Sequence, residues 1–236
     1  MPQAPALVGD LAASVIGRRA HVLDVRQPAP GFLELEMRAD APPGGWRPGQ
    51  EVQFRVTPSL GRRYTVRTVS GPDAEQISIL AATEAAGPGA AWLGRLRAGD
   101  RTTVLAGRFR PLREHGTRRL YLGDGCALGT LDACAQHGET PVVAVEVPAD
   151  AVAPLADRWP TYRFLPAGKA PGDALQSWLE RGLDVGEFTD AGLDGALLLG
   201  HAQSIQRQRR ALTDSRVLPR RAITTKPYWA TGKKGL

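Results

Sequence analysis

The stretch that decides the fold is Arg62-Arg63-Tyr64-Thr65-Val66-Arg67. Alternate residues of a β-strand share a face, so Arg62 and Tyr64 point one way while Arg63 and Thr65 point the other. A tyrosine beside an arginine offers an aromatic plane next to a cation that pairs well with phosphate. The pattern suits a ligand that is part flat ring and part phosphate. Taken alone, it also fits an exposed strand with solvated arginines.

Short strands surround this stretch in the first half of the chain. Apolar alternation between turns rich in glycine and proline marks the segments 20–26, 32–38, 52–56, 63–70, 76–80 and 101–105. Six strands in about 90 residues predict a closed, six-stranded antiparallel barrel. We expect this barrel to form a domain over residues 1–112.

A second motif, Gly87-Pro88-Gly89-Ala90-Ala91-Trp92, opens the one helix expected in this half. Free backbone N–H groups at a helix start attract anions, although a plain turn into a helix would have the same sequence. The two motifs together predict a barrel that holds a dinucleotide. Its pyrophosphate would lie on Arg62 and on the amides of Gly87 to Ala90, and its ring on Tyr64.

The second half of the chain alternates strands with helices. Strands are predicted at 119–123, 141–147, 162–165, 196–199 and 222–225, and helices at 127–137, 149–157, 174–181 and 204–213. This alternation predicts a parallel sheet with crossover helices, as a domain over residues 118–236 after a polar joint at 110–117. The turn after Leu122 lacks the full G-x-G-x-x-G of a classical dinucleotide fold.

Composition excludes several classes of protein. A chain of 236 residues that is 42% hydrophobic and 23% charged is typical of globular proteins. We see neither a signal peptide nor an apolar run near the ~18 residues of a membrane span, so we expect a cytoplasmic protein with no membrane partner. Cys126 and Cys134 are expected in the core, and the four histidines are scattered, so no metal site is predicted. No paired carboxylates or Ser/His constellation appear, so we name no catalytic residue.

The net charge of +6 suggests an anionic partner. Arginines supply all but four of the 30 basic residues, and guanidinium groups pair bidentately with phosphate or carboxylate. The basic residues are dispersed and no nucleic-acid-binding motif appears, so we expect no nucleic-acid partner. We expect a monomer.

Four stretches resemble the siderophore-interacting protein family, flavin-dependent ferric-siderophore reductases related to ferredoxin–NADP reductases. Arg62 to Arg67 fits the family's R-x-Y-T-x-R, and Gly87 to Leu93 is similar to its G-P-A-S-x-W-A. Residues 122–128 resemble its G-D-E-T-A-L, and the end of the chain resembles its arginine-rich segment and terminal G-Y-W. Matching pieces occur in the right order from residue 47 to residue 235.

The resemblance implies a six-stranded FAD-binding barrel followed by a parallel-sheet domain that resembles NAD(P)-binding domains. Electrons would pass from NADPH, NADH or ferredoxin through FAD to a ferric siderophore, with release of Fe(II). The implied cofactor-binding residues are Arg62, Tyr64, Thr65, Thr83, Gly87, Gly89, Ala90 and Trp229, with Tyr228 near the same ring or the donor. The implied siderophore-binding residues are Arg108, Lys233 and Lys234.

Several positions depart from the family pattern. Thr83 stands where a histidine is usual, Ala90 replaces a serine, and Ala230 replaces an arginine. Gln53, Pro227 and His201 also differ from the family's usual residues. Arg207, Arg209 and Arg210 either select the 2′-phosphate of NADPH or form a solvated helix face. Two other functions stay open: a flavin reductase that serves a redox protein or quinone, and a non-enzymatic binder of an anionic ligand.

Overall fold

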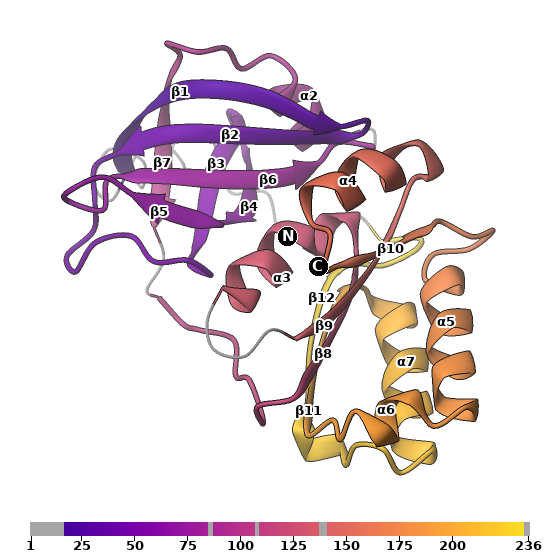
Figure 1. Ribbon diagram of the computed structural model, residues 1–236. Helices are drawn as coiled ribbons and strands as arrows, with labels where there is room; N and C mark the ends of the chain where they lie inside the picture. Colours follow the sequence, from indigo (N-terminus) through magenta and orange to yellow (C-terminus); the bar gives the residue numbers. More distant parts are fainter. Residues whose placement is uncertain (1–16, 85–86, 107–108, 137–140, 234–236) are drawn as a thin grey trace. The chain divides into compact units, whose positions relative to one another are not determined.

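A computed structural model describes residues 17–84, 87–106, 109–136 and 141–233 (Figure 1). The chain divides into two compact units, residues 1–111 and 112–236. Each unit has its own sheet and its own apolar core.

Unit 1 is built on an antiparallel sheet of seven strands in the order β4-β3-β7-β1-β2-β6-β5. The strands are β1 (Gly17–Ala29), β2 (Phe32–Ala39), β3 (Glu51–Thr57), β4 (Leu60–Thr65), β5 (Thr68–Ser70), β6 (Gln76–Ala82) and β7 (Arg101–Ala106). The short helix α2 (Pro88–Leu93) lies between β6 and β7 in the chain. The predicted antiparallel β domain is confirmed.

The predicted count of six strands is wrong because the segment 63–70 forms two strands. β4 pairs with β3 and β5 pairs with β6, at opposite edges of the sheet. Between them the Val66 N–H donates to the Gln50 carbonyl at 2.9 Å and the Arg67 N–H donates to the Ser78 carbonyl at 2.8 Å. Two residues therefore join the two edges. The sheet is barrel-like, but no strand pairing among the described residues closes it, which corrects the predicted closed barrel.

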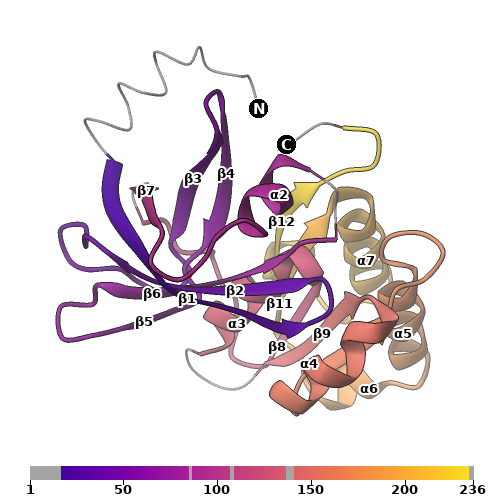
Figure 2. The same cartoon turned by 90° about the horizontal axis from the view of Figure 1, so that it is seen from above.

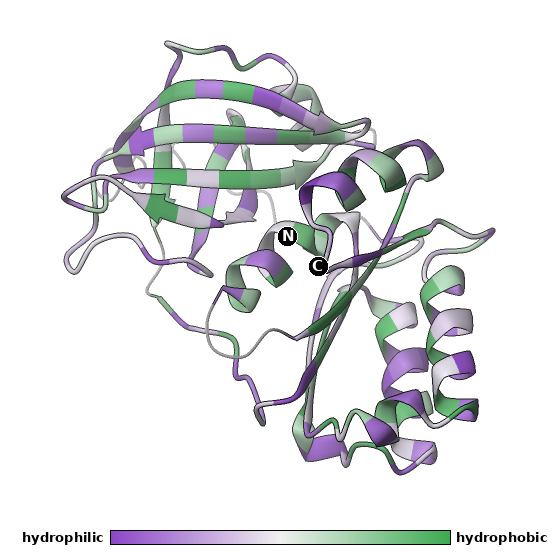
Figure 3. Ribbon diagram, viewed as in Figure 1, coloured by the Kyte–Doolittle hydropathy of each residue, from purple (hydrophilic) through white to green (hydrophobic). Residues whose placement is uncertain are grey.

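Apolar alternation fixes which face of each strand is buried. Val52, Phe54 and Val56 of β3 are buried, while the residues between them are half-buried. Figure 3 shows the same alternation along the long strands of this unit. Trp46 completes the core from the loop before β3, where its indole N–H donates to the Ala39 carbonyl at 3.1 Å.

Unit 2 is a parallel sheet of five strands in the order β10-β9-β8-β11-β12, as predicted. Its strands are β8 (Arg119–Asp124), β9 (Val142–Val147), β10 (Arg163–Pro166), β11 (Gly195–His201) and β12 (Ile223–Trp229). Its helices are α3 (Leu128–Ala135), α4 (Val152–Arg158), α5 (Asp173–Asp184), α6 (Glu187–Asp190) and α7 (Ala202–Asp214), with 3-10 turns at Gly125–Ala127, Ala149–Ala151 and Arg220–Ala222. Sequence analysis missed the one-turn helix α6.

Helices cover both faces of this sheet. In Figures 1 and 2, α5 and α7 lie side by side, and Figure 1 shows them on the face opposite α3. Leu120 and Leu122 of β8 belong to the core formed with α5 and α7. Gly123 faces the other way, because a Cβ there would lie 2.8 Å from the Ala127 Cβ and 3.0 Å from Leu131. A glycine at 123 therefore allows the segment that leads into α3 to pack closely on the sheet.

The order of the strands reverses direction between β8 and β11. After β8 the chain adds β9 and β10 on one side, and then returns to add β11 and β12 on the other. Open parallel sheets bind ligands at the carboxyl ends of the strands beside such a switch point. Here those ends carry Asp124 and His201.

Candidate functional site

In unit 1 the arginine-containing motif, residues 62–67, comes into contact with the glycine-rich motif, residues 87–92. Arg62 and Tyr64 lie on β4, and both are half-buried. A Cβ on Gly89 of α2 would lie 3.0 Å from the Tyr64 hydroxyl oxygen and 3.3 Å from the Arg62 Cγ. The lack of a side chain at position 89 therefore lets the α2 backbone approach both residues closely. The Tyr64 ring, the Arg62 side chain and the glycine-rich turn therefore lie next to one another.

Tyr64 packs against two other aromatic residues, Phe54 and Trp92. The Tyr64 ring centroid lies 5.9 Å from that of Phe54 and 6.4 Å from that of Trp92. Phe54 and Trp92 stack on each other at 5.1 Å with an interplanar angle of 30°. Phe54 is fully buried, whereas Tyr64 is only half-buried. The cluster ties the strand and the helix together while part of the tyrosine stays accessible.

The other predicted cofactor residues of unit 1 differ in their surroundings. Thr65 is half-buried beside Tyr64 on β4. Gly87 is exposed, has an extended backbone and caps α2, and Ala90 is half-buried in the first turn. Thr83 follows β6, where its backbone N–H donates to the Gly31 carbonyl at 2.7 Å. That contact extends the β2–β6 pair, and β6 also contacts β4 where the two edges of the sheet approach each other.

Sequence analysis missed a buried ion pair behind this motif. The Arg67 guanidinium donates to the carboxylate of Glu34 on β2, and only 1% of the Glu34 side chain is exposed. The pair holds the segment that joins the two sheet edges against β2. The sequence signal was the glutamate at position 34, which stands among apolar residues in Phe32-Leu33-Glu34-Leu35.

In unit 2, three side chains meet at the carboxyl edge beside the switch point. The Trp229 indole N–H donates to Asp124 Oδ2 at 2.7 Å, and the ring centroids of Trp229 and His201 lie 4.4 Å apart. Asp124 Oδ1 also accepts from the Cys126 N–H at 3.0 Å. Gly200 has φ +110°, and a Cβ there would lie 2.4 Å from Asp124 Oδ2. The carboxylate thus packs directly against the β11 backbone.

Burial shifts the proton affinity of both titratable groups in this cluster. It raises the pKa of the Asp124 carboxyl to about 6, against the opposing effect of hydrogen bonds from Trp229, His201 and Cys126. It lowers the pKa of His201, with a smaller contribution from the charge of Arg207. At neutral pH the cluster therefore carries an ionised aspartate and a neutral histidine.

Tyr228 and Trp229 have different partners, at a point where the pairing of β12 with β11 shifts register. The Tyr228 hydroxyl donates to Thr130 Oγ1 on α3 at 3.0 Å. Only Trp229 belongs to the cluster with Asp124 and His201.

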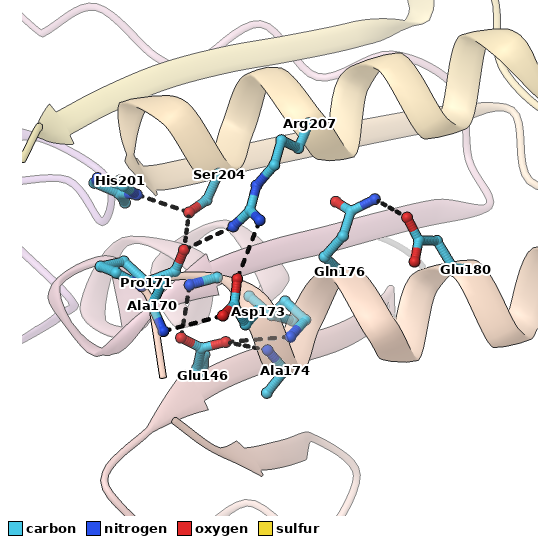
Figure 4. A network of polar contacts seen from close by, with 12 residues as sticks. Glu146, Ala170, Pro171, Asp173, Ala174, Gln176, Glu180, His201, Ser204 and Arg207 are labelled. Atoms are coloured by element: carbon cyan, nitrogen blue, oxygen red, sulfur yellow. Dashed lines mark hydrogen bonds and ion pairs between the residues drawn. The ribbon is translucent and has the colours of Figure 1, made fainter. Parts of the chain in front are cut away.

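The arginines considered for a 2′-phosphate are spread along α7. Arg207 is paired with Asp173 at 3.1 Å and also donates to the Pro171 carbonyl at 2.9 Å. Arg209 and Arg210 lie further along the helix and line a groove with Asp214 and Arg220. Near Arg207, the Glu146 carboxylate accepts N–H groups of Gly172, Ala174 and Leu175 at the start of α5 (Figure 4).

The predicted substrate residues are only partly described. Arg108 and Lys234 lie outside the described residues. Lys233 is exposed, and its backbone N–H donates to the Ala230 carbonyl at 3.2 Å. Cys134 is buried as predicted, but Cys126 is exposed because it lies in the 3-10 turn after β8 and not within a packed helix.

The described residues also lack two features of other classes of protein. No group of three or more His, Cys, Asp or Glu side chains in this part of the chain is placed to hold a metal ion. No helix within it is long and apolar enough to cross a membrane.

Comparison with known proteins finds solved structures that share this fold. No family model and no curated protein matches the sequence. Among solved structures, the siderophore-interacting protein from Acinetobacter baumannii is 14% identical with a TM-score of 0.71, covering 92% of this chain and 91% of that one. A siderophore utilization protein from T. fusca is 20% identical with a TM-score of 0.66, covering 93% of this chain and 95% of its own.

Phthalate dioxygenase reductase, a modular protein for electron transfer from pyridine nucleotides to a 2Fe-2S centre, is 14% identical with a TM-score of 0.71. It is matched over 94% of this chain and 71% of its own length. The chain therefore has the two-domain fold of siderophore-interacting and ferredoxin-reductase-type proteins.

Proposed function

We propose that this protein is a flavin-dependent reductase that reduces ferric siderophores. The observation that carries the proposal is the close approach of Gly89 to Tyr64 and Arg62. A half-buried aromatic ring, an arginine side chain and backbone without a side chain lie together there, which supports binding of a flavin dinucleotide. The fold shared with siderophore-interacting proteins supports the same reading.

The residues around Gly89 fit FAD. Tyr64 would stack on the flavin ring, Thr65 would hydrogen-bond at its edge, and Arg62 would pair with the pyrophosphate. The amides of Gly87, Gly89 and Ala90 would donate to the phosphates, and Thr83 would contact the cofactor more weakly than a histidine. Bound FAD supplies a carrier that accepts two electrons together and passes them on one at a time.

We assign the electron donor to unit 2. The carboxyl edge beside the switch point, with Asp124, His201 and Trp229, would receive NADH or NADPH. Trp229 would present its ring to a flat partner there. A ferredoxin is the other donor that the basic chain would attract.

The substrate in this proposal is an anionic complex of Fe(III) with hard oxygen ligands. The net charge of +6 attracts such a complex, and Arg108, Lys233 and Lys234 would contact it. Reduction to Fe(II) weakens the match between the metal and its hard ligands, which releases the iron. No side chain needs to transfer a proton at the iron. The protein would act in the cytoplasm as a monomer.

A second candidate substrate is a redox protein, because the reductase of phthalate dioxygenase shares this fold. The deciding experiment mixes FAD-loaded protein, NADH or NADPH, and a ferric trishydroxamate or triscatecholate with a ferrous trap. We expect Fe(II) well above a control with the same amount of free FAD. Flavin reduction without Fe(II) above that control would leave a flavin reductase and exclude the siderophore as substrate.

A further inference from the structure

The side chains around Trp229 make a set of hydrogen bonds and one ring contact at the carboxyl edge of unit 2. From this set we propose that Asp124 and His201 are positioning residues that hold Trp229 in one orientation, and that Ser204 acts through His201. The inference rests on the proposed function, in which this edge receives the electron donor. It extends that function by naming residues outside the stacking surface on which electron delivery depends.

Asp124 fixes one side of the indole. Its carboxylate accepts the Trp229 indole N–H at 2.7 Å and is itself held by the backbone N–H groups of Cys126 and His201. The left-handed backbone of Gly200, with φ +110°, leaves room for the carboxylate where a side chain would collide with it. The acceptor of the indole proton therefore has little freedom to move.

His201 packs against the Trp229 ring, with an angle of 38° between the ring planes. The tautomer of His201 can be deduced from its neighbours, of which Figure 4 shows Ser204 and Pro171. The Ser204 hydroxyl lies 2.6 Å from the Pro171 carbonyl, to which it must donate because a carbonyl has no proton. Since that hydroxyl has one proton, the contact of 2.7 Å between Ser204 Oγ and His201 Nδ1 requires the proton to be on Nδ1.

The contacts of the other ring nitrogen, Nε2, lead independently to the same tautomer. The Thr231 backbone N–H points at His201 Nε2 at 3.4 Å, and the Thr231 hydroxyl lies 3.0 Å from the same atom. A backbone N–H can only donate, so Nε2 is an acceptor and carries no proton. His201 is therefore held neutral, with Nδ1 protonated, by contacts on both sides of the ring.

Charged groups around the cluster affect the pKa values of Asp124 and His201. Glu146 raises the pKa of Asp124, and Arg207 lowers that of His201 while Glu146 opposes that effect. Protonation of Asp124 removes the charge that strengthens its hydrogen bond with the indole. Protonation of His201 at Nε2 would make this nitrogen a donor facing the Thr231 N–H donor, so their hydrogen bond would be lost. Neutral pH thus favours the ordered form of the cluster.

An indole held in one orientation is a better stacking partner for a flat ring than one that samples several orientations. The test compares Asp124→Asn and Ser204→Ala with the wild-type holoprotein. The matched controls are Asp157→Asn, at an exposed position of α4, and Ser215→Ala, just after the end of α7. We expect FAD content to stay unchanged and the rate constant of flavin reduction by the nicotinamide to fall about tenfold in both test variants. The controls should keep the wild-type rate.

A spectroscopic measurement separates positioning from a general loss of structure. In nitrogen-15-labelled protein, the Trp229→Phe variant assigns one of the five indole signals. We expect that signal to shift with pH with a midpoint near 6 in the wild type and to lose this titration in Asp124→Asn. Ring nitrogen shifts of His201 should show a protonated Nδ1, and Ser204→Ala should weaken that preference.

Two results would overturn the inference: wild-type reduction rates in both test variants, or a Trp229 signal that does not follow Asp124. Failure of the proposed function has a different signature, because FAD would then not bind or would not be reduced in any variant. The indole and imidazole spectra decide the positioning of Trp229 in that case as well.

Discussion

Substitution of Gly89 by alanine tests the contact on which the proposed cofactor site depends. The new Cβ would lie 3.0 Å from the Tyr64 hydroxyl oxygen and 3.3 Å from the Arg62 Cγ, closer than carbon atoms normally approach either atom. Tyr64 and Arg62 must therefore retreat by a few tenths of an ångström. Alanine favours a helix over glycine by about 1 kcal/mol, which offsets the cost of this contact for the fold.

We therefore expect Gly89→Ala to unfold at nearly the wild-type urea concentration but to bind FAD about tenfold more weakly, since a misplaced tyrosine, arginine and backbone amide each lose part of their contact. The assay is titration of apoprotein with FAD, followed by quenching of flavin fluorescence. Gly94→Ala is the matched control, because its Cβ would meet only the Ala90 carbonyl at an ordinary 3.4 Å. Equal FAD affinity in Gly89→Ala and wild type would refute the reasoning, as would an equal loss in Gly94→Ala.

Substitutions at three other positions have defined outcomes. Tyr64→Ala should abolish FAD binding while the protein stays folded by circular dichroism, and Tyr64→Phe should retain most of the affinity because the stacking plane remains; loss of folding in Tyr64→Ala would make the residue a core residue only. Glu34→Gln leaves the buried Arg67 guanidinium without its counter-charge, so the free energy of unfolding in urea should fall by about 3 kcal/mol; a loss under about 1 kcal/mol would contradict the buried pair. Burial raises the pKa of Asp124 from 3.8 to about 6, so the folded state binds this proton more tightly than the unfolded chain. The stability from that proton is complete below pH 3.8 and is lost as pH rises through about 6. Relative to Asp124→Asn, the wild type should therefore lose about 2 kcal/mol between pH 4.5 and pH 7.5 in urea unfolding, and a constant difference would show that Asp124 is not buried.

The fold class could be predicted from the sequence because the periods of its two halves differ. Apolar alternation in β2 and β3 marks strands with one buried face, and strand–helix alternation after residue 118 allows few arrangements other than a parallel sheet. The break between β4 and β5 could not be predicted. Alternation continues through Val66 and Arg67, and only pairing with two different strands separates the segments.

The contacts that support the two candidate sites could not be predicted either, because they join residues far apart in the sequence. Glu34 and Arg67 are 33 residues apart, and Asp124 and Trp229 are 105 residues apart. Local sequence shows that a buried carboxylate needs a partner, but it does not show which distant residue supplies it. The Gly87 to Trp92 motif could be recognised as a glycine-rich helix start, but a plain turn has the same sequence, and its close approach to Tyr64 and Arg62 depends on the fold.

The proposed flavin site is tested most directly by an anaerobic titration of purified protein with FAD, in parallel with the Tyr64→Ala variant. We expect saturation at one FAD per chain with an altered visible flavin spectrum, and no saturable change in the variant. A wild-type protein that leaves the FAD spectrum and fluorescence unchanged at every concentration would contradict it.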